Sequence, residues 1–171
     1  MKCSDTVGTV GAPNETQQDT LPTQAWLNSI ADKVDHHVSI LDAHEYPINM
    51  FTSTSVPSSF RHYLSRIQAH LDFDQSTYMH ALVYLNRISP YYGTIVGRME
   101  IHRAFATCLL LAMKFNCDET ILFSRFALVT GLRKSELVHL EAETLKRLEY
   151  DVFCSQGHIQ ACNSWLRGTV S

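Results

Sequence analysis

The stretch that decides the fold is IHRAFATCLLLAMKFNCD, residues 101–118. Its middle, from Ala104 to Met113, is apolar almost all the way round a helix, and Arg103 and Lys114 bound it. A helix that is apolar on every side must be enclosed by other parts of the protein. Because the run is about half of the ~20 residues that a transmembrane helix needs, it predicts a buried central helix over residues 99–115 and no membrane span.

Amphipathic patterns on both sides of this stretch predict the helices that would enclose it. Apolar residues recur there at steps of three and four, which is the spacing of one helical face. Asp74 or Ser76 is a candidate N-cap, and Gly131 is placed to follow a helix as its C′ residue. No run alternates with a period of two for long enough to predict a strand, so we expect an all-α fold. The patterns cover residues 23–41, 60–71, 78–88, 119–130 and 135–148, with a short closing helix around 159–166.

Length and composition favour one globular domain with a flexible N-terminal tail. The chain has 171 residues, of which 45% are hydrophobic and 18% charged, a balance typical of proteins that fold around one core. Residues 1–22 contain few large apolar side chains and are expected to stay flexible. We therefore expect a tail (1–22), a leading helix and linker (23–55), a helical box (56–152) and a C-terminal helical extension (153–171).

Charge and motif content argue against several classes of function. The formal net charge is -3, so no overall basic field would attract nucleic acid or an anionic membrane. Gly93 and Gly97 lack the spacing of a phosphate-binding loop, and no serine-nucleophile motif occurs. We expect no enzymatic activity, no cofactor, no small-molecule substrate and neither nucleic acid nor a membrane as partner.

The nine histidines and five cysteines do not form a metal-binding pattern. No C-x-x-C, H-E-x-x-H or H-x-x-x-H spacing occurs, so no metal site is expected. The cysteines also lack the spacing of a disulfide framework, and no apolar signal sequence follows the first two residues. These features predict reduced thiols in an intracellular protein of the cytoplasm, the nucleus or both.

One charged residue stands out on an apolar helical face. Glu141 lies on the stripe formed by Leu137 and Leu145, and its neighbours three and four positions away include no basic side chain. A carboxylate there is costly unless another element satisfies it, and Lys114, at the end of the central helix, is the plausible counterpart. Two interpretations remain: an internal salt bridge or solvated pair, or a charged pair at the edge of an apolar binding surface.

Five segments in order along the chain together resemble the cyclin box. The pairing of P-S-x-x-x-x-Y-L-x-R-I in the first segment with N-R-I and I-H-R is similar to the P/U-type cyclins, the branch that includes the yeast phosphate-signalling cyclin. The segments are VPSSFRHYLSRI (56–67), HALVYLNRI (80–88), IHRAFATCLLLAMKFNCD (101–118), FALVTGL (126–132) and LVHLEAETLKRLEYDV (137–152).

The resemblance implies a single five-helix cyclin box with an additional N-terminal helix and a short C-terminal helix. It also implies a non-catalytic regulatory subunit that binds and activates a cyclin-dependent protein serine/threonine kinase by positioning the kinase's regulatory helix, in cell-cycle control or in phosphate and nutrient signalling. By position, the resemblance assigns kinase binding to Lys114, Glu141, Phe115, Leu145, Tyr150 and Val152.

Three further positions are assigned structural roles by the resemblance. Arg66 fits the P/U pattern, whereas Asn86 precedes Arg87 where cyclins usually carry aspartate, which removes one charge from a structural ion pair. The alternative function is a cyclin-box-like adaptor in transcription or another protein-binding helical module. The nearly neutral charge of the box argues against the transcription adaptor, which would normally show a basic face.

Overall fold

The computed structural model describes residues 21–41, 48, 50–54, 58–89, 97–116 and 123–168. Within these residues the fold has seven helices and no strand, which confirms the predicted all-α class. The predicted tail (1–22), apart from its last two residues, and the predicted helix start at 119–122 lie outside the described residues. The helices are α1 (Gln24–Leu41), α2 (Phe60–Leu71), α3 (Gln75–Ile88), α4 (Ile101–Asn116), α5 (Phe123–Thr130), α6 (Lys134–Arg147) and α7 (Gln156–Arg167).

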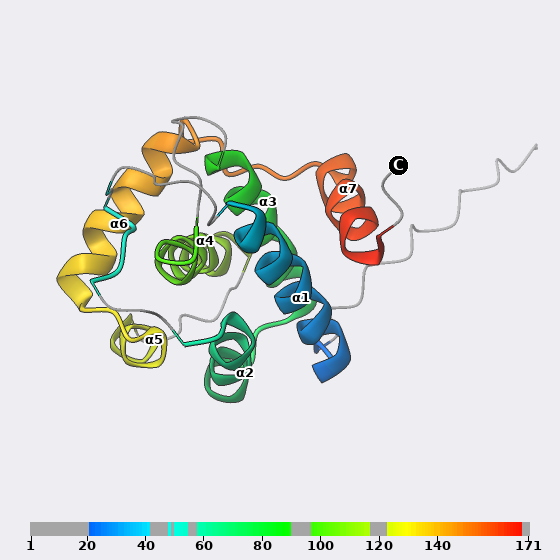
Figure 1. Cartoon of the computed structure of the whole chain (residues 1–171). Coiled ribbons are helices and arrows are strands. Elements are labelled where there is room, and N and C mark those ends of the chain that lie inside the picture. The colour runs from blue at the N-terminus through cyan, green and yellow to red at the C-terminus, as the bar shows by residue number, and fades with distance from the viewer. Residues whose placement is uncertain are drawn as a thin grey trace, which may run out of the picture.

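The apolar stretch that was expected to form the centre of the fold does so as α4. Figure 1 shows α4 nearly end-on, with α2, α3, α5 and α6 arranged around it. Every side chain from Ala104 to Met113 is buried, including Cys108. The hydroxyl of Thr107 is also buried, and it donates a hydrogen bond to the carbonyl oxygen of Arg103 (2.7 Å). The buried hydroxyl of Thr107 therefore has a hydrogen-bond partner within its own helix.

Local capping interactions explain where the surrounding helices begin and end. The carboxylate of Asp74 accepts a hydrogen bond from the amide of Thr77 (2.6 Å) at the start of α3, which selects Asp74 and not Ser76 as the N-cap. At the end of α5, Gly131 has a φ of 76°, and the following amide of Leu132 donates to the carbonyl of Ala127 (3.0 Å). Gly131 was predicted for its role from the sequence, and Asp74 was one of two predicted N-cap candidates.

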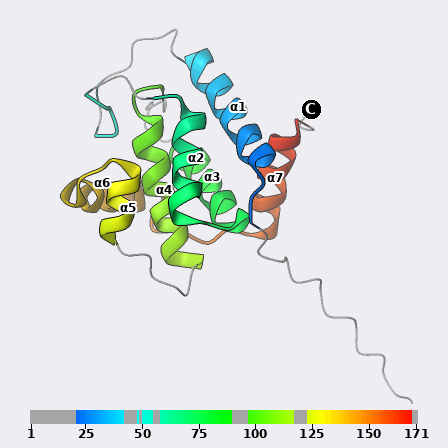
Figure 2. The ribbon, with the colours of Figure 1, turned by 90° about the horizontal axis from the view of Figure 1, so that it is seen from below.

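Helices α1 and α7 extend the five-helix box α2–α6 along one side. Figure 2 shows α1 beside α2 and α7, and α7 also packs against α3. The inward face of α1 is apolar and contains Leu27, Ile30 and Val34, all buried. On its outer edge, Asp32 forms an ion pair with Arg61 of α2. Both helices are thus packed against the box.

The linker between α1 and α2 is held against α4 and α6 around Phe51. The ring of Phe51 is buried, and the guanidinium of Arg147 lies 4.8 Å from its centre. One residue later, the carbonyl of Thr52 accepts a hydrogen bond from Arg103 of α4 (2.6 Å), and Arg103 also forms an ion pair with Glu136 of α6. Phe51 therefore acts as the apolar anchor of the linker.

None of the helices in the described part of the chain combines the length and the apolar character needed to cross a bilayer. In the same residues, no three His, Cys, Asp or Glu side chains gather in a way that would hold a metal ion.

Candidate functional site

The predicted charged pair is formed across two helices. The Nζ atom of Lys114, in the last turn of α4, lies 2.5 Å from Oε1 of Glu141 in the middle of α6. The lysine side chain is 47% exposed and the glutamate side chain 17%. Lys114 also lies over the ring of Phe123 at 5.9 Å. Glu141 is thus satisfied by the residue that sequence reasoning named, while the lysine stays open to solvent.

The other residues that the resemblance assigns to kinase binding differ in how deeply they are buried. Phe115, next to Lys114, is half-exposed, and its ring lies 6.3 Å from the ring of His80 on α3. Leu145 and Val152 are partly buried and pack on the core. Tyr150 is 69% exposed. Phe115 and Tyr150 are therefore open to solvent, whereas Leu145 and Val152 are part of the packed structure.

The turn after α6 presents Tyr150 to solvent. Glu149 and Tyr150 both have left-handed backbone conformations, with φ of 52° and 62°. The amide of Tyr150 donates to the carbonyl of Leu145 (2.9 Å), and the amide of Asp151 donates to that of Leu148 (2.9 Å). These bonds satisfy carbonyl groups at the helix end, in the manner of a Schellman motif. Left-handed conformations are costly for residues other than glycine, so the turn is held by these bonds.

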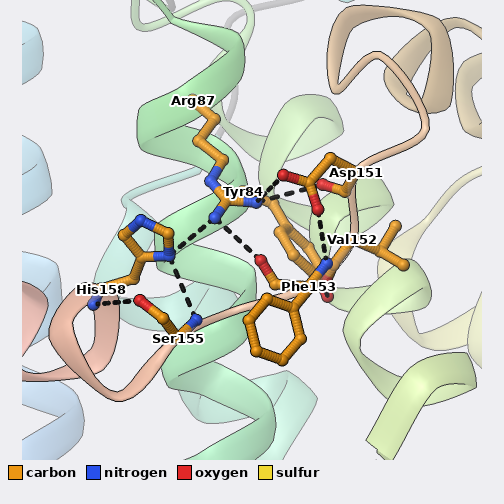
Figure 3. A network of polar contacts seen from close by, with 7 residues as sticks. All are labelled: Tyr84, Arg87, Asp151, Val152, Phe153, Ser155 and His158. Atoms are coloured by element: carbon orange, nitrogen blue, oxygen red, sulfur yellow. Dashed lines mark hydrogen bonds and ion pairs between the residues drawn. The ribbon is translucent and has the colours of Figure 1, made fainter.

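Side chains of α3 fix the extended segment that follows this turn (Figure 3). The hydroxyl of Tyr84 donates to the carbonyl of Val152 (2.7 Å). Arg87 donates to the carbonyls of Asp151 (3.1 Å) and Phe153 (2.9 Å). Burial, the main cause, raises the pKa of Tyr84, so its hydroxyl stays protonated and remains a donor. Three successive carbonyl groups are therefore bonded to one face of α3.

The same guanidinium connects this segment with α7. The Nη2 atom of Arg87 lies 2.8 Å from Nδ1 of His158, and the backbone amide of Ser155 also donates to this nitrogen (3.2 Å). The hydroxyl of Ser155 caps α7 by accepting from the amide of His158 (3.3 Å). Arg87 further lies 4.0 Å from the carboxylate of Asp151. Arg87 therefore connects α3 with the extended segment and with α7.

The other two positions assigned structural roles are exposed. The guanidinium of Arg66 lies 5.3 Å from the centre of the Tyr63 ring on its own helix. Asn86 is exposed and lies beside a groove between α1, α3 and α7, of which Arg87 and Trp165 are also part. The structure thus joins Arg87 to a network of contacts and places Arg66 and Asn86 at the surface.

No nucleophile is formed by the thiols in the described residues. Cys108, Cys154 and Cys162 are all free. Burial raises the pKa of Cys108, and it raises the pKa of Cys162 to about 11. These groups therefore stay as neutral thiols near pH 7. What the region around Lys114 and Glu141 offers is exposed apolar area with a charged pair, which suits binding of another protein.

A comparison with protein families shows to which family the chain belongs. The family model described as Cyclin matches residues 10–152, which include all of α1–α6. The chain belongs to the cyclin family. Helices α2–α6 form its cyclin box, with α1 before the box and α7 after it, which confirms the expected fold.

Individual relatives of this cyclin are of the types that the sequence motifs indicated. It is 30% identical to the PHO85 cyclin-like protein psl1 of Schizosaccharomyces pombe, over 71% of this chain and 53% of that protein. It is 30% identical to PHO85 cyclin-7 of Saccharomyces cerevisiae, over 67% of this chain and 45% of that protein. It is 28% identical to Cyclin-P2-1 of Oryza sativa, over 70% of this chain and 55% of that protein. The cyclin spans about half the length of the curated relatives it matches.

Sequence reasoning missed two features of this cyclin. Phe153, which is 64% exposed beside the assigned residues, follows no helical periodicity because it lies in an extended segment. The contact of Arg103 with Glu136 and Thr52 joins residues that are far apart in the chain. A large aromatic residue next to the assigned Val152 was the signal that would have identified Phe153.

Proposed function

We propose that this cyclin is the non-catalytic regulatory subunit of a cyclin-dependent protein kinase. It would bind the kinase through a surface that comprises Lys114, Phe115, Glu141, Leu145, Tyr150 and Val152, hereafter the kinase-binding surface. The proposal rests on the membership of the cyclin family and on relatives that are named as cyclins of PHO85. An intracellular location fits the free thiols of the described residues.

The observation that carries the proposal is the charged pair between α4 and α6 beside the exposed aromatic side chain of Phe115. Glu141 is mostly buried by its surroundings, yet Lys114 and the neighbouring Phe115 stay about half exposed. An apolar surface with aromatic groups supplies affinity, and a fixed charged pair selects the partner and its register. A kinase helix that packs here would be held where its glutamate pairs with the ATP-contacting lysine, a requirement of phosphoryl transfer.

The kinase would be activated by differential binding. A cyclin that contacts the regulatory helix only in its active position shifts the kinase toward the active state by the difference in binding free energy between the two states. No residue of the cyclin needs to touch the reacting phosphate for this mechanism. The expected role is therefore regulatory, in the cell cycle or in phosphate and nutrient signalling.

The test is a pulldown from extract of the source organism with the wild-type cyclin and three charge-reversal variants. Lys114→Glu and Glu141→Lys should abolish retention of a cyclin-dependent kinase, identified by mass spectrometry and by kinase activity. Lys134→Glu makes the same charge change at an exposed position at the start of α6, so it should retain the kinase. Circular dichroism and thermal unfolding of each variant confirm that the fold is intact.

Two results would contradict the proposal in different ways. If the wild-type cyclin retains no cyclin-dependent kinase, the function is wrong. If all three variants retain the kinase equally, the function holds and the contact surface lies elsewhere on the molecule.

A further inference from the structure

One face of α3 contacts two residues of the kinase-binding surface, although α3 contributes none of the assigned residues. The ring of His80 lies 6.3 Å from the ring of Phe115, in the last turn of α4. Four residues later, on the same face of α3, the hydroxyl of Tyr84 donates to the carbonyl of Val152 (2.7 Å). The first contact reaches α4, and the second reaches the extended segment after α6. This face of α3 therefore supports two parts of the kinase-binding surface.

The ring of His80 is held in place by two contacts within α3. Its Nδ1 atom lies 2.8 Å from the backbone carbonyl oxygen of Ser76, one turn earlier. Because a carbonyl oxygen only accepts, this nitrogen carries the proton and donates the hydrogen bond. The ring also lies edge to face with the buried ring of Tyr84, with 6.4 Å between the two centroids. His80 thus has an oriented ring before any partner binds.

Phe115 needs a contact of this kind because it lies close to the end of its helix. Its side chain is 50% exposed, and α4 ends one residue later, at Asn116. Helix ends fray, and a side chain that becomes ordered only on binding lowers the affinity. The separation of 6.3 Å from the ring of His80 falls within the range of favourable aromatic pairs. This contact restricts Phe115 in the free cyclin and so reduces the entropy that is lost on binding.

We propose that His80 is a positioning residue of the kinase-binding surface, which holds the ring of Phe115 ready for the kinase. The partner is the same cyclin-dependent kinase, so this inference rests on the proposed function. His80 itself need not touch the kinase, because it acts through Phe115. The loss of affinity caused by removing His80 should therefore disappear once the ring of Phe115 is also removed.

The experiment measures the dissociation constant of the complex between the cyclin and the purified kinase that the wild-type cyclin retains from extract. Phe115→Ala should weaken binding about tenfold, the loss typical of truncating an aromatic interface residue. His80→Ala should weaken binding about threefold, because one interface side chain must then be ordered when the kinase binds. Thermal unfolding of each variant shows that binding is measured on folded protein.

Two further variants test whether the ring of His80 is the group that matters. His80→Phe keeps a ring beside Phe115 and should restore the affinity of the wild type. His139→Ala is the matched control, because Nδ1 of His139 lies 2.6 Å from the carbonyl oxygen of Ser135, the same local bond in α6. His139 is exposed, and it points away from Glu141, since two residues are about 200° apart around a helix. Its removal should leave the dissociation constant unchanged.

A double-mutant cycle separates positioning from an independent contribution of His80. In the Phe115→Ala background, His80→Ala should cause no further loss of affinity, because the ring that His80 positions is then absent. An independent role of His80, through direct contact with the kinase or through the packing of α3, would give losses that multiply.

The outcomes distinguish this inference from the function on which it rests. If the wild-type cyclin binds the kinase, Glu141→Lys does not, and His80→Ala binds as tightly as His139→Ala, then the role of His80 is wrong and the function stands. The role of His80 is also wrong if the losses multiply, or if His80→Phe binds as weakly as His80→Ala. Absence of any kinase bound to the wild type overturns both proposals.

Discussion

Lys114 and Glu141 form an ion pair of 2.5 Å that joins the last turn of α4 to the middle of α6. The two side chains differ in exposure, because the carboxylate is largely enclosed while nearly half of the lysine side chain faces solvent. Solvent around one partner weakens the electrostatic attraction between the two. The pair is therefore better suited to recognition of another molecule than to stabilising the fold.

We expect neutralisation of this pair to have a small effect on stability. The double variant Lys114→Met/Glu141→Gln should change the free energy of unfolding by no more than about 1 kcal/mol, the usual contribution of a partly exposed ion pair. Urea unfolding at pH 7 measures this change. The same variant should lose retention of the kinase, so that binding and stability respond differently. A loss of several kcal/mol would instead show that the pair is an internal structural contact.

The enclosed position of α4 predicts a much larger effect for substitutions in its centre. Leu109 is fully buried there, and Leu109→Ala should lower the free energy of unfolding by about 2–5 kcal/mol through lost burial and the cavity that remains. Leu128→Ala, at an exposed position, should cost less than about 0.5 kcal/mol. Chemical denaturation of the two variants tests this contrast. The prediction would be wrong if both variants lost similar amounts of unfolding free energy.

Helices and the charged pair can be predicted from the sequence better than other tertiary contacts can. The reason is that local interactions leave a periodic pattern in the sequence, whereas long-range interactions do not. The periodicity around Leu109 reveals α4, since a helix that is apolar all round has one physical solution, enclosure by other helices. Lys114 was predicted as the partner of Glu141 because no basic side chain on α6 is within reach of the carboxylate. That they meet is confirmed by the structure. That they bind a kinase stays a prediction.

Contacts that depend on tertiary structure gave no such signal. Arg103 directly precedes an apolar run in the sequence. Nothing near it indicates that it would bond Thr52, far earlier in the chain, and pair with Glu136 on α6. Arg87 was assigned a structural role by family resemblance, but its three acceptors lie on the segment after α6 and on α7. Only the packing of α3 against α7 brings these groups together.

The N-cap of α3 offers a test of local stabilisation. The carboxylate of Asp74 accepts a short hydrogen bond from the amide of Thr77, so Asp74→Ala leaves this amide without its partner and should cost about 1 kcal/mol. Asp74→Asn keeps an acceptor of the same shape and should cost only a few tenths of that amount. Thermal or urea unfolding compares the two variants. Equal losses would show that the negative charge, and not the cap geometry, is what stabilises α3.

His102 is placed where a charged imidazole is unfavourable. It lies on the first turn of α4, with its ring 5.6 Å from that of Phe60 and 4.7 Å from that of Tyr63, both of α2. Burial is the main cause that lowers the pKa of His102 from 6.5 to about 4, and the positive charge of Arg66 acts in the same direction. The folded cyclin therefore keeps this imidazole neutral at pH values where the unfolded chain binds a proton.

This difference predicts a loss of stability as the pH falls from about 6.5 to about 4. In that window the unfolded state binds one more proton at His102 than the folded state, so acid favours unfolding. His102→Leu removes the titrating group, and its free energy of unfolding should fall less steeply than that of the wild type between pH 7 and pH 4.5. His62→Leu, at an exposed position of α2, should follow the wild type. Urea unfolding at several pH values measures the three slopes, and parallel curves for His102→Leu and wild type would show that the imidazole is protonated in the folded cyclin as readily as in the unfolded chain.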